Sequence, residues 1–100
     1  MELDKVRRRV YDNVLDNWIT LKSLHVLRMC PVDVFFTAST HKLHGSTLKA
    51  LHKAGYLNCE PTKDGLGLEY YLNVHGHRLR RWHISASEAE EIPFNIPIQQ

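Results

Sequence analysis

The sequence lacks the features that mark several classes of protein. No stretch free of charged residues is longer than nine residues, far short of the ~20 apolar residues that a membrane-spanning helix needs. Charged side chains at Glu2, Asp4 and Lys5 stand where a signal peptide would carry its apolar core. The two cysteines, Cys30 and Cys59, form no C-x-x-C pair, which favours free thiols over a disulfide or a structural zinc site. We therefore expect a cytoplasmic protein with no place in a membrane.

Catalytic motifs are missing as well. Histidine is plentiful, with seven residues, and pairs such as His41 and His44 or His75 and His77 have the residue type that binds metals. No H-E-x-x-H motif, carboxylate pair or nucleophile motif accompanies them. The sequence also offers no base with an orienting acid at a useful spacing. We therefore expect no enzyme activity, no cofactor and no metal site.

Charge is unevenly distributed along the chain. One hundred residues, 43% hydrophobic and 24% charged, fit one small globular domain. The formal net charge is only +2, but Glu88, Glu90 and Glu91 lie in the last thirteen residues, and the body before them carries thirteen Lys and Arg against eight Asp and Glu. A basic body favours an anionic partner, either nucleic acid or an acidic protein. The plain alternative is an ordinary solvated surface on which positive charges exceed negative ones by chance.

The first forty residues predict two or three helices. In residues 1–18 apolar side chains recur at steps of three and four, which predicts an amphipathic N-terminal helix; they are Leu3, Val6, Val10, Val14 and Trp18. A second helix follows, with Thr20 as its N-cap and Pro31 as its stop. Residues 34–38 favour a short third helix capped by Asp33, although the run Val-Phe-Phe-Thr is also typical of a strand.

The segment between Thr40 and Gly55 is the most informative. With Thr40 as N-cap and Gly55 as a left-handed stop, residues 41–54 form a helix with one apolar side. At about 100° per residue, the opposite side carries cations and small residues and no acidic residue: His41, Lys42, Gly45, Ser46, Lys49, His52 and Lys53. Gly45 in mid-helix costs about 1 kcal/mol relative to alanine. It marks either a break, with a shorter helix over residues 46–54, or a point where a partner approaches the backbone closely.

The second half predicts a β-hairpin, a closing helix and a tail. Residues 56–59 and 68–74 have strand character and flank a turn over residues 63–67. Residues 75–82 follow as an amphipathic helix. In residues 85–100 apolar side chains alternate with prolines and polar residues, a pattern of extended backbone that cannot be an inner strand. The apolar strip of this tail suits a protein partner's sheet edge, a second subunit or the protein's own body; it consists of Ile92, Phe94, Ile96 and Ile98.

Three short motifs carry a resemblance to a known family. They are Leu24-His25-Val26-Leu27, then Leu48 and Leu51 ahead of Ala54-Gly55-Tyr56-Leu57, and finally Tyr71-Leu72-Asn73-Val74-His75-Gly76. Over residues 18–83 this pattern resembles the winged helix-turn-helix domain of MarR-like transcriptional regulators. In that family the second motif ends the recognition helix and the third leaves the wing, and Asn73 here takes the capping position of a threonine. The wing lacks the family's arginine-rich tip.

The resemblance implies a fold and a function. The expected fold is α+β, mostly α: a winged helix-turn-helix with an extra N-terminal helix and a short two-stranded wing. Residues 1–84 would form this domain, with the extra helix over residues 1–18, the recognition helix over residues 40–55, the wing over residues 56–74 and an acidic, proline-containing tail over residues 85–100. The implied function is binding of double-stranded DNA as a small transcriptional regulator.

The residues of the basic face divide the expected DNA-binding roles. Lysines suit phosphates, namely Lys42, Lys49 and Lys53, whereas short polar and imidazole groups suit base edges, namely Ser46, Thr47, His41 and His52. Gly45 would let the helix sit close to a strand, and Lys63 at the wing tip would meet the minor groove or the backbone. A homodimer would form through Leu3, Val10, Val14 and Trp18. The alternative function is a winged-helix protein-interaction module or inhibitor that docks an acidic partner surface.

Overall fold

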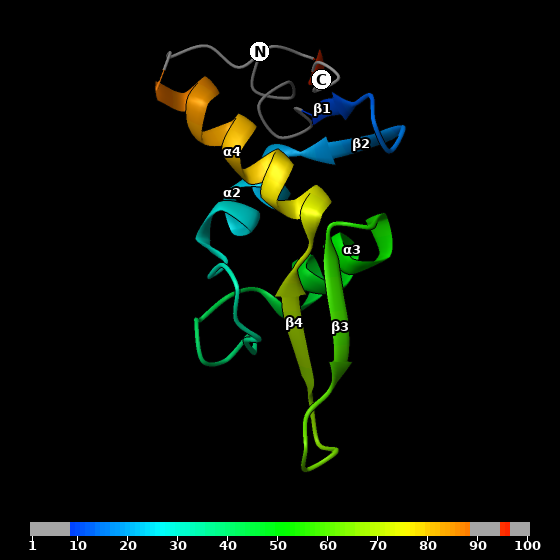
Figure 1. Cartoon of the computed structure of the whole chain (residues 1–100), viewed down its shortest axis with the longest axis vertical. Coiled ribbons are helices and arrows are strands. Elements are labelled where there is room, and N and C mark those ends of the chain that lie inside the picture. The colour runs from blue at the N-terminus through cyan, green and yellow to red at the C-terminus, as the bar shows by residue number, and fades with distance from the viewer. Residues whose placement is uncertain (1–8, 89–94, 97–100) are drawn as a thin grey trace.

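Two β-hairpins lie at opposite ends of a centre made of helices (Figure 1). The computed structural model describes residues 9–88 and 95–96, which hold three helices and two antiparallel strand pairs. In chain order the elements are β1 (Arg9–Asp12), β2 (Asn17–Thr20), α2 (Leu21–Met29), α3 (Gly45–Ala54), β3 (Leu57–Pro61), β4 (Leu68–Leu72), α4 (Val74–Glu88) and β5 (Asn95–Ile96). The architecture is therefore α+β, as the sequence predicts.

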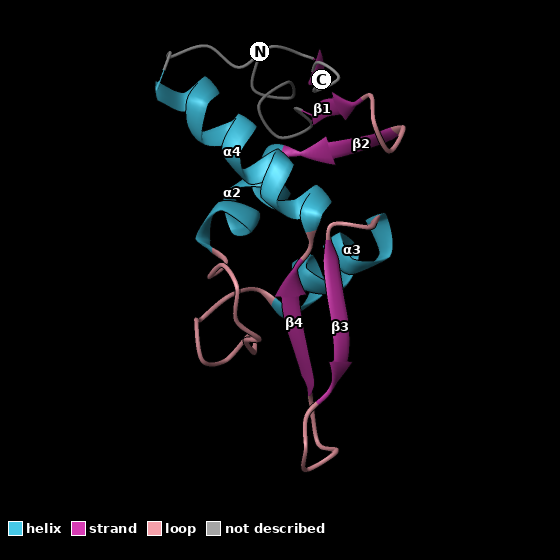
Figure 2. Ribbon diagram, in the orientation of Figure 1, coloured by secondary structure: helices cyan, strands magenta, loops and turns pink. Residues whose placement is uncertain are grey.

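Both hairpins have a defined register. β1 and β2 pair antiparallel, with Val10 opposite Ile19, and β5 lies parallel to β1 on its other side. β3 and β4 pair antiparallel over their full length, and their hairpin projects away from the helices (Figure 2). A bridge between Phe36 and Tyr70 adds a rung to this hairpin, because each backbone N–H donates to the other's carbonyl oxygen, at 2.9 and 2.8 Å. The loop after α2 is thereby tied to β4.

The core lies where the helices meet the root of the β3–β4 hairpin. Each helix and β4 contribute leucines with no exposed surface; these are Leu24, Leu27, Leu48, Leu72 and Leu79. Burying one such side chain stabilises the fold by about 1.5–3 kcal/mol. α4 approaches the start of β3 so closely that an ideal Cβ on Gly76 would lie 2.3 Å from the carbonyl oxygen of Tyr56. Only glycine fits there without a shift of backbone.

Three helix boundaries follow the predicted capping chemistry. Thr20 Oγ1 accepts a hydrogen bond from the Ser23 N–H at 3.1 Å and starts α2. Gly55, at φ 100°, ends α3 in the left-handed conformation. Asn73 Oδ1 accepts hydrogen bonds from the N–H groups of His75 and Gly76, both at 3.0 Å, and so caps the start of α4.

The predicted N-terminal helix is wrong over residues 9–18, which form β1, a turn and the start of β2. Burial in β1 follows a period of two: Val10 and Asp12 are buried, whereas Arg9 is exposed and Tyr11 half-buried. A helix would place Val10 and Trp18 on one face, but Val10 is 1% exposed and Trp18 58%. The spacing of the apolar residues in this short segment fits both a helix and a strand. The pairing of β1 with β2 decides for the strand. The rest of the predicted helix, residues 1–8, lies outside the described residues.

Two other helix predictions need correction. The helix over residues 34–38 is wrong, because Phe36 bridges to β4 instead, so the strand alternative is the closer one. The helix expected from His41 begins only at Gly45, with His44 as its N-cap, and Thr40 does not cap it. Residues 38–42 form turns instead. The alternative with a shorter helix is therefore the closer one, although Gly45 is the first residue of α3 and not part of the turn before it.

The predicted tail begins too early. α4 continues through residues 85–88, where extended backbone was expected, because no proline or glycine interrupts the chain before Pro93 and Ala86 finds a buried position. Asn95 and Ile96 pair with Tyr11 and Asp12, so this part of the tail adds to the protein's own sheet. The other members of the apolar strip, Ile92, Phe94 and Ile98, lie outside the described residues.

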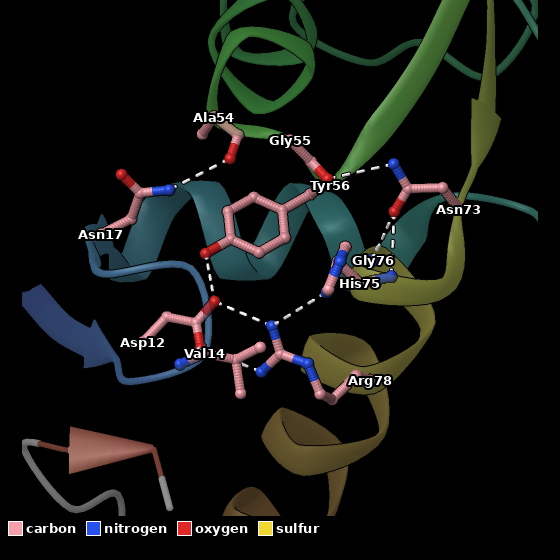
Figure 3. A network of polar contacts seen from close by, with 10 residues as sticks. All are labelled: Asp12, Val14, Asn17, Ala54, Gly55, Tyr56, Asn73, His75, Gly76 and Arg78. Carbon is pink, nitrogen blue, oxygen red and sulfur yellow. Dashed lines mark hydrogen bonds and ion pairs between the residues drawn. The ribbon is translucent and has the colours of Figure 1, made fainter. Parts of the chain in front are cut away.

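A buried carboxylate joins both ends of the fold (Figure 3). Asp12 has no exposed surface. The Tyr56 hydroxyl donates to its Oδ2 at 2.5 Å, and both terminal nitrogens of the Arg78 guanidinium donate to its two oxygens at 2.9 Å. The Val14 N–H adds a bond to Oδ1 at 3.1 Å. β1, the start of β3 and α4 are thus held by one side chain.

Removing this carboxylate should strongly destabilise the fold. Asp12→Ala leaves the Arg78 guanidinium buried without its counter-charge, at a cost of about 3–5 kcal/mol in the free energy of unfolding. Tyr56→Phe removes one hydrogen bond to a charged group and costs about 1.5–3 kcal/mol. Urea unfolding followed by circular dichroism measures both. An Asp12→Ala loss below about 1 kcal/mol, ordinary for a surface substitution, would contradict this account.

Asp12 should also make stability depend on pH. Burial raises the pKa of this carboxyl, but the hydrogen bonds from Arg78, Tyr56 and Val14 outweigh burial and lower the pKa below its ordinary value. Such a group stabilises the fold fully above its unfolded pKa of about 3.9, and that contribution is lost as the pH falls through the folded pKa. Between about pH 6 and 2, the urea midpoint of the wild type should fall more steeply than that of Asp12→Asn. Parallel curves would refute this.

Candidate nucleic-acid interface

The exposed face of α3 is basic and carries no carboxylate. Thr47, Leu48 and Leu51 are buried and fix the orientation of the helix. The opposite side exposes polar and cationic side chains and one alanine: Ser46, Lys49, Ala50, His52 and Lys53. No Asp or Glu occurs in the sequence from residue 34 to residue 59. The positive charge of this face is therefore not neutralised from within its own helix or the segments next to it in the chain.

The start of α3 orders the polar side chains before it. The imidazole Nδ1 of His44 lies 2.8 Å from Ser46 Oγ and 3.1 Å from Thr47 Oγ1. Thr47 is only 8% exposed and its hydroxyl contacts the imidazole at the helix start, so little of its side chain is available to base edges. Ser46 stays exposed.

Two predicted contact residues lie in the turn before α3 rather than on the helix. His41 and Lys42 are both exposed, and the His41 ring packs edge-on against Phe36 with ring centroids 5.7 Å apart. Lys42 adopts a left-handed conformation, at φ 53°. Both residues are therefore exposed just before the N-terminal end of α3, but they project from a turn and not from the helix as predicted.

Gly45 is not required by the fold itself. An ideal Cβ built on it would meet no atom within 4 Å, and its φ is not positive. A glycine with open space at the first residue of an exposed helix lets another molecule approach the backbone. The structure thus leaves room for the close approach that the sequence predicts there.

The tip of the β3–β4 hairpin is an ordered turn with one cation. Asp64 Oδ1 accepts hydrogen bonds from the Leu66 N–H at 2.9 Å and from the Thr62 hydroxyl at 2.5 Å, and these bonds lower the pKa of Asp64. Gly65 supplies a φ of 73°. Lys63 is exposed, as predicted for the wing tip, but the ionised Asp64 lies beside it. The hairpin therefore offers a fixed projection with little net charge.

The predicted dimer interface does not form one surface. Val10 is buried in the protein's own core, Val14 is 40% exposed in the β1–β2 turn and Trp18 is 58% exposed on the outer face of β2. Leu3 lies outside the described residues. The expected stripe depended on a helix, and the hairpin places these residues on different faces. Sequence reasoning missed the surface role of Trp18 because it assigned the wrong period to residues 9–18.

Two groups with reactive side chains are buried. Burial raises the pKa of the Cys30 thiol to about 12, and its Sγ donates to the Val26 carbonyl oxygen at 3.3 Å. His83 is 7% exposed, and burial, followed by the charges of Arg28 and His25, lowers its pKa. Both side chains therefore pack between α2 and α4, and neither is exposed to react with a molecule in solution.

The described part of the chain offers neither a membrane-spanning helix nor a cluster of metal ligands. Within residues 9–88 and 95–96, no helix is long and apolar enough to cross a membrane. The same residues hold no group of three His, Cys, Asp or Glu side chains placed to bind a metal ion.

Comparison with known proteins assigns no family. No family model, no curated protein and no solved structure matches the chain. The residues of α3, the β3–β4 hairpin and their neighbours are therefore the only guide to a function.

Gly45→Ala should leave the fold intact or stabilise it. Alanine fits the open space, and the gain is up to about 1 kcal/mol from helix propensity and reduced unfolded-state freedom. Thermal unfolding followed by circular dichroism should show a Tm that is unchanged or a few degrees higher. Gly76→Ala is the matched control and should lower the Tm, because its Cβ would clash with the Tyr56 carbonyl. A lower Tm for Gly45→Ala would mean that the fold itself needs this glycine.

Proposed function

We propose that this protein binds double-stranded DNA through α3 and the β3–β4 hairpin, and acts as a small transcriptional regulator. The observation that carries the proposal is the exposed side of α3, where Lys49, Lys53 and His52 lie on a helix held rigid by its buried leucines and where no carboxylate is present. A protein surface that binds DNA must neutralise phosphates, and this is the described helix face best suited to do so.

The arrangement of the elements supports the same function. α2, the Phe36–Tyr70 bridge, the turns over residues 38–42, α3 and the β3–β4 hairpin follow one another along the chain. This order is similar to that of a winged helix, except that turns stand where the helix before the recognition helix would be. In that arrangement the recognition helix enters the major groove, about 12 Å wide, and the wing lies beside it. Ser46 and His52 are then the candidates for base edges, and Lys63 for the backbone or the minor groove.

One observation favours a second function, docking of a protein. The loop after α2 exposes apolar side chains: Val32 is 40%, Val34 50% and Phe35 46% exposed. The Phe35 ring packs on Tyr71 of β4 with ring centroids 5.0 Å apart. The loop and β4 therefore share an apolar surface that does not belong to α3. A protein partner with an acidic and apolar face would use the lysines of α3 together with this loop.

Lysine substitutions on α3 test the DNA proposal. Lys49→Ala and Lys53→Ala should each reduce the slope of log affinity against log salt by about one, because one phosphate contact is lost. Fluorescence anisotropy of a labelled duplex between about 50 and 200 mM salt measures the slope, with a single strand as the comparison ligand. Arg81→Ala, at an exposed cation on α4, is the matched control and should leave the slope unchanged.

Two outcomes would contradict the proposal. The first is an absence of duplex binding by the wild type at tens of micromolar protein and low salt. The second is a loss of slope in Arg81→Ala equal to that in the α3 variants, which would mean that charge alone and not this face drives binding.

A further inference from the structure

A shallow groove borders α3 on the side of the β1–β2 hairpin. Its volume is about 210 Å³, and its walls come from β2 with the start of α2 and from the Ala50–Ala54 side of α3. The side-chain amide of Asn17 donates to the Ala54 carbonyl oxygen at 3.0 Å (Figure 3). This bond joins the two walls, so the groove is a fixed feature of the fold.

An exposed tryptophan forms one rim of the groove. Trp18 lines it while remaining 58% exposed. The Arg9 guanidinium carbon lies 5.3 Å from the centroid of the Trp18 ring, and the Tyr11 ring packs against it at 5.1 Å. A cation held over an aromatic ring is kept near one position. Trp18 and Arg9 therefore form an ordered pair beside α3.

The charges around the groove select an anionic occupant. From residue 17 to residue 59 the sequence contains a single acidic residue, Asp33. Three exposed lysines are sequence neighbours of residues that line the groove. Lys22 precedes Ser23 on one wall, and Lys49 and Lys53 precede the two alanines of the other wall. The lining itself is largely apolar, with Trp18 and the two alanines. An occupant should thus combine an apolar body with negative charge.

We propose that this groove holds one sugar–phosphate strand of the duplex that α3 binds, with Trp18 against a deoxyribose and Arg9 on a phosphate. A helix in the major groove has a sugar–phosphate strand on each side, and the strand on the Ala50–Ala54 side runs along β2. The C–H groups of the sugar meet the tryptophan and the alanines, while the phosphates meet the cations. This inference rests on the proposed function and adds the first hairpin to the DNA-binding surface.

Tryptophan fluorescence tests the contact directly. The chain has two tryptophans, so Trp82→Phe leaves Trp18 as the only one. In a titration of this variant with a labelled duplex, anisotropy reports binding and iodide quenching reports the exposure of Trp18. We expect the quenching by iodide to fall in step with the rise in anisotropy, because the bound strand covers the ring.

Substitutions give an independent readout. Trp18→Ala should weaken duplex binding about fivefold, because the apolar contact between the ring and the sugar is lost, and Trp18→Phe should retain most of the affinity. Arg9→Gln should reduce the salt slope by about one. The matched controls are Val74→Ala, an exposed apolar residue on α4, and Arg81→Gln, which should bind as the parent does. If Trp18→Ala fails to fold, Arg9→Gln and the quenching titration still decide the question.

The outcomes separate this inference from the proposed function. Duplex binding by anisotropy with unchanged iodide quenching, unaltered affinity in Trp18→Ala and an unaltered salt slope in Arg9→Gln would overturn the inference and leave the proposed function standing. Failure to bind any duplex would overturn both. Protection of Trp18 that grows with protein concentration in the absence of DNA would assign the groove to a second copy of the chain, and would also overturn the inference.

Discussion

The buried carboxylate of Asp12 is the contact on which the arrangement of the other elements depends. Its partners Tyr56 and Arg78 lie 44 and 66 residues away in the sequence. A buried charge without partners is strongly destabilising, so the first hairpin is stable in its place only when the start of β3 and α4 are in theirs. The contact thereby couples the N-terminal hairpin to the C-terminal half of the domain.

The same coupling fixes the surroundings of α3. Tyr56 follows directly after Gly55, the residue that ends α3, so the bond to Asp12 also holds the junction between α3 and β3 in place. Asn17 then holds β2 beside Ala54. On the other hairpin, the bridge between Phe36 and Tyr70 holds β4 against the loop after α2. A rigid basic helix with ordered neighbours is the kind of support that a specific binding surface requires.

The parts of the fold that depend on local chemistry could be predicted from the sequence, and those that depend on distant partners could not. Thr20, Gly55 and Asn73 set helix ends through their own side chains or backbone, and Lys49, His52 and Lys53 lie on the exposed face that the helical period indicates. Residues 9–18 fitted both a helix and a hairpin, and the pairing with Tyr56 and Arg78 that decides between them is invisible in the local pattern. For the same reason, the place of Trp18 beside α3 could not be found from the sequence.

A direct test of the account is to map amide chemical shifts of the labelled protein during titration with a duplex at about 50 mM salt, where non-specific contacts to phosphates are strong. The account predicts that the largest changes lie in α3 and at the tip of the β3–β4 hairpin, over residues 45–54 and 62–67. Changes concentrated in the exposed apolar loop over residues 32–35, or no changes at all, would contradict it.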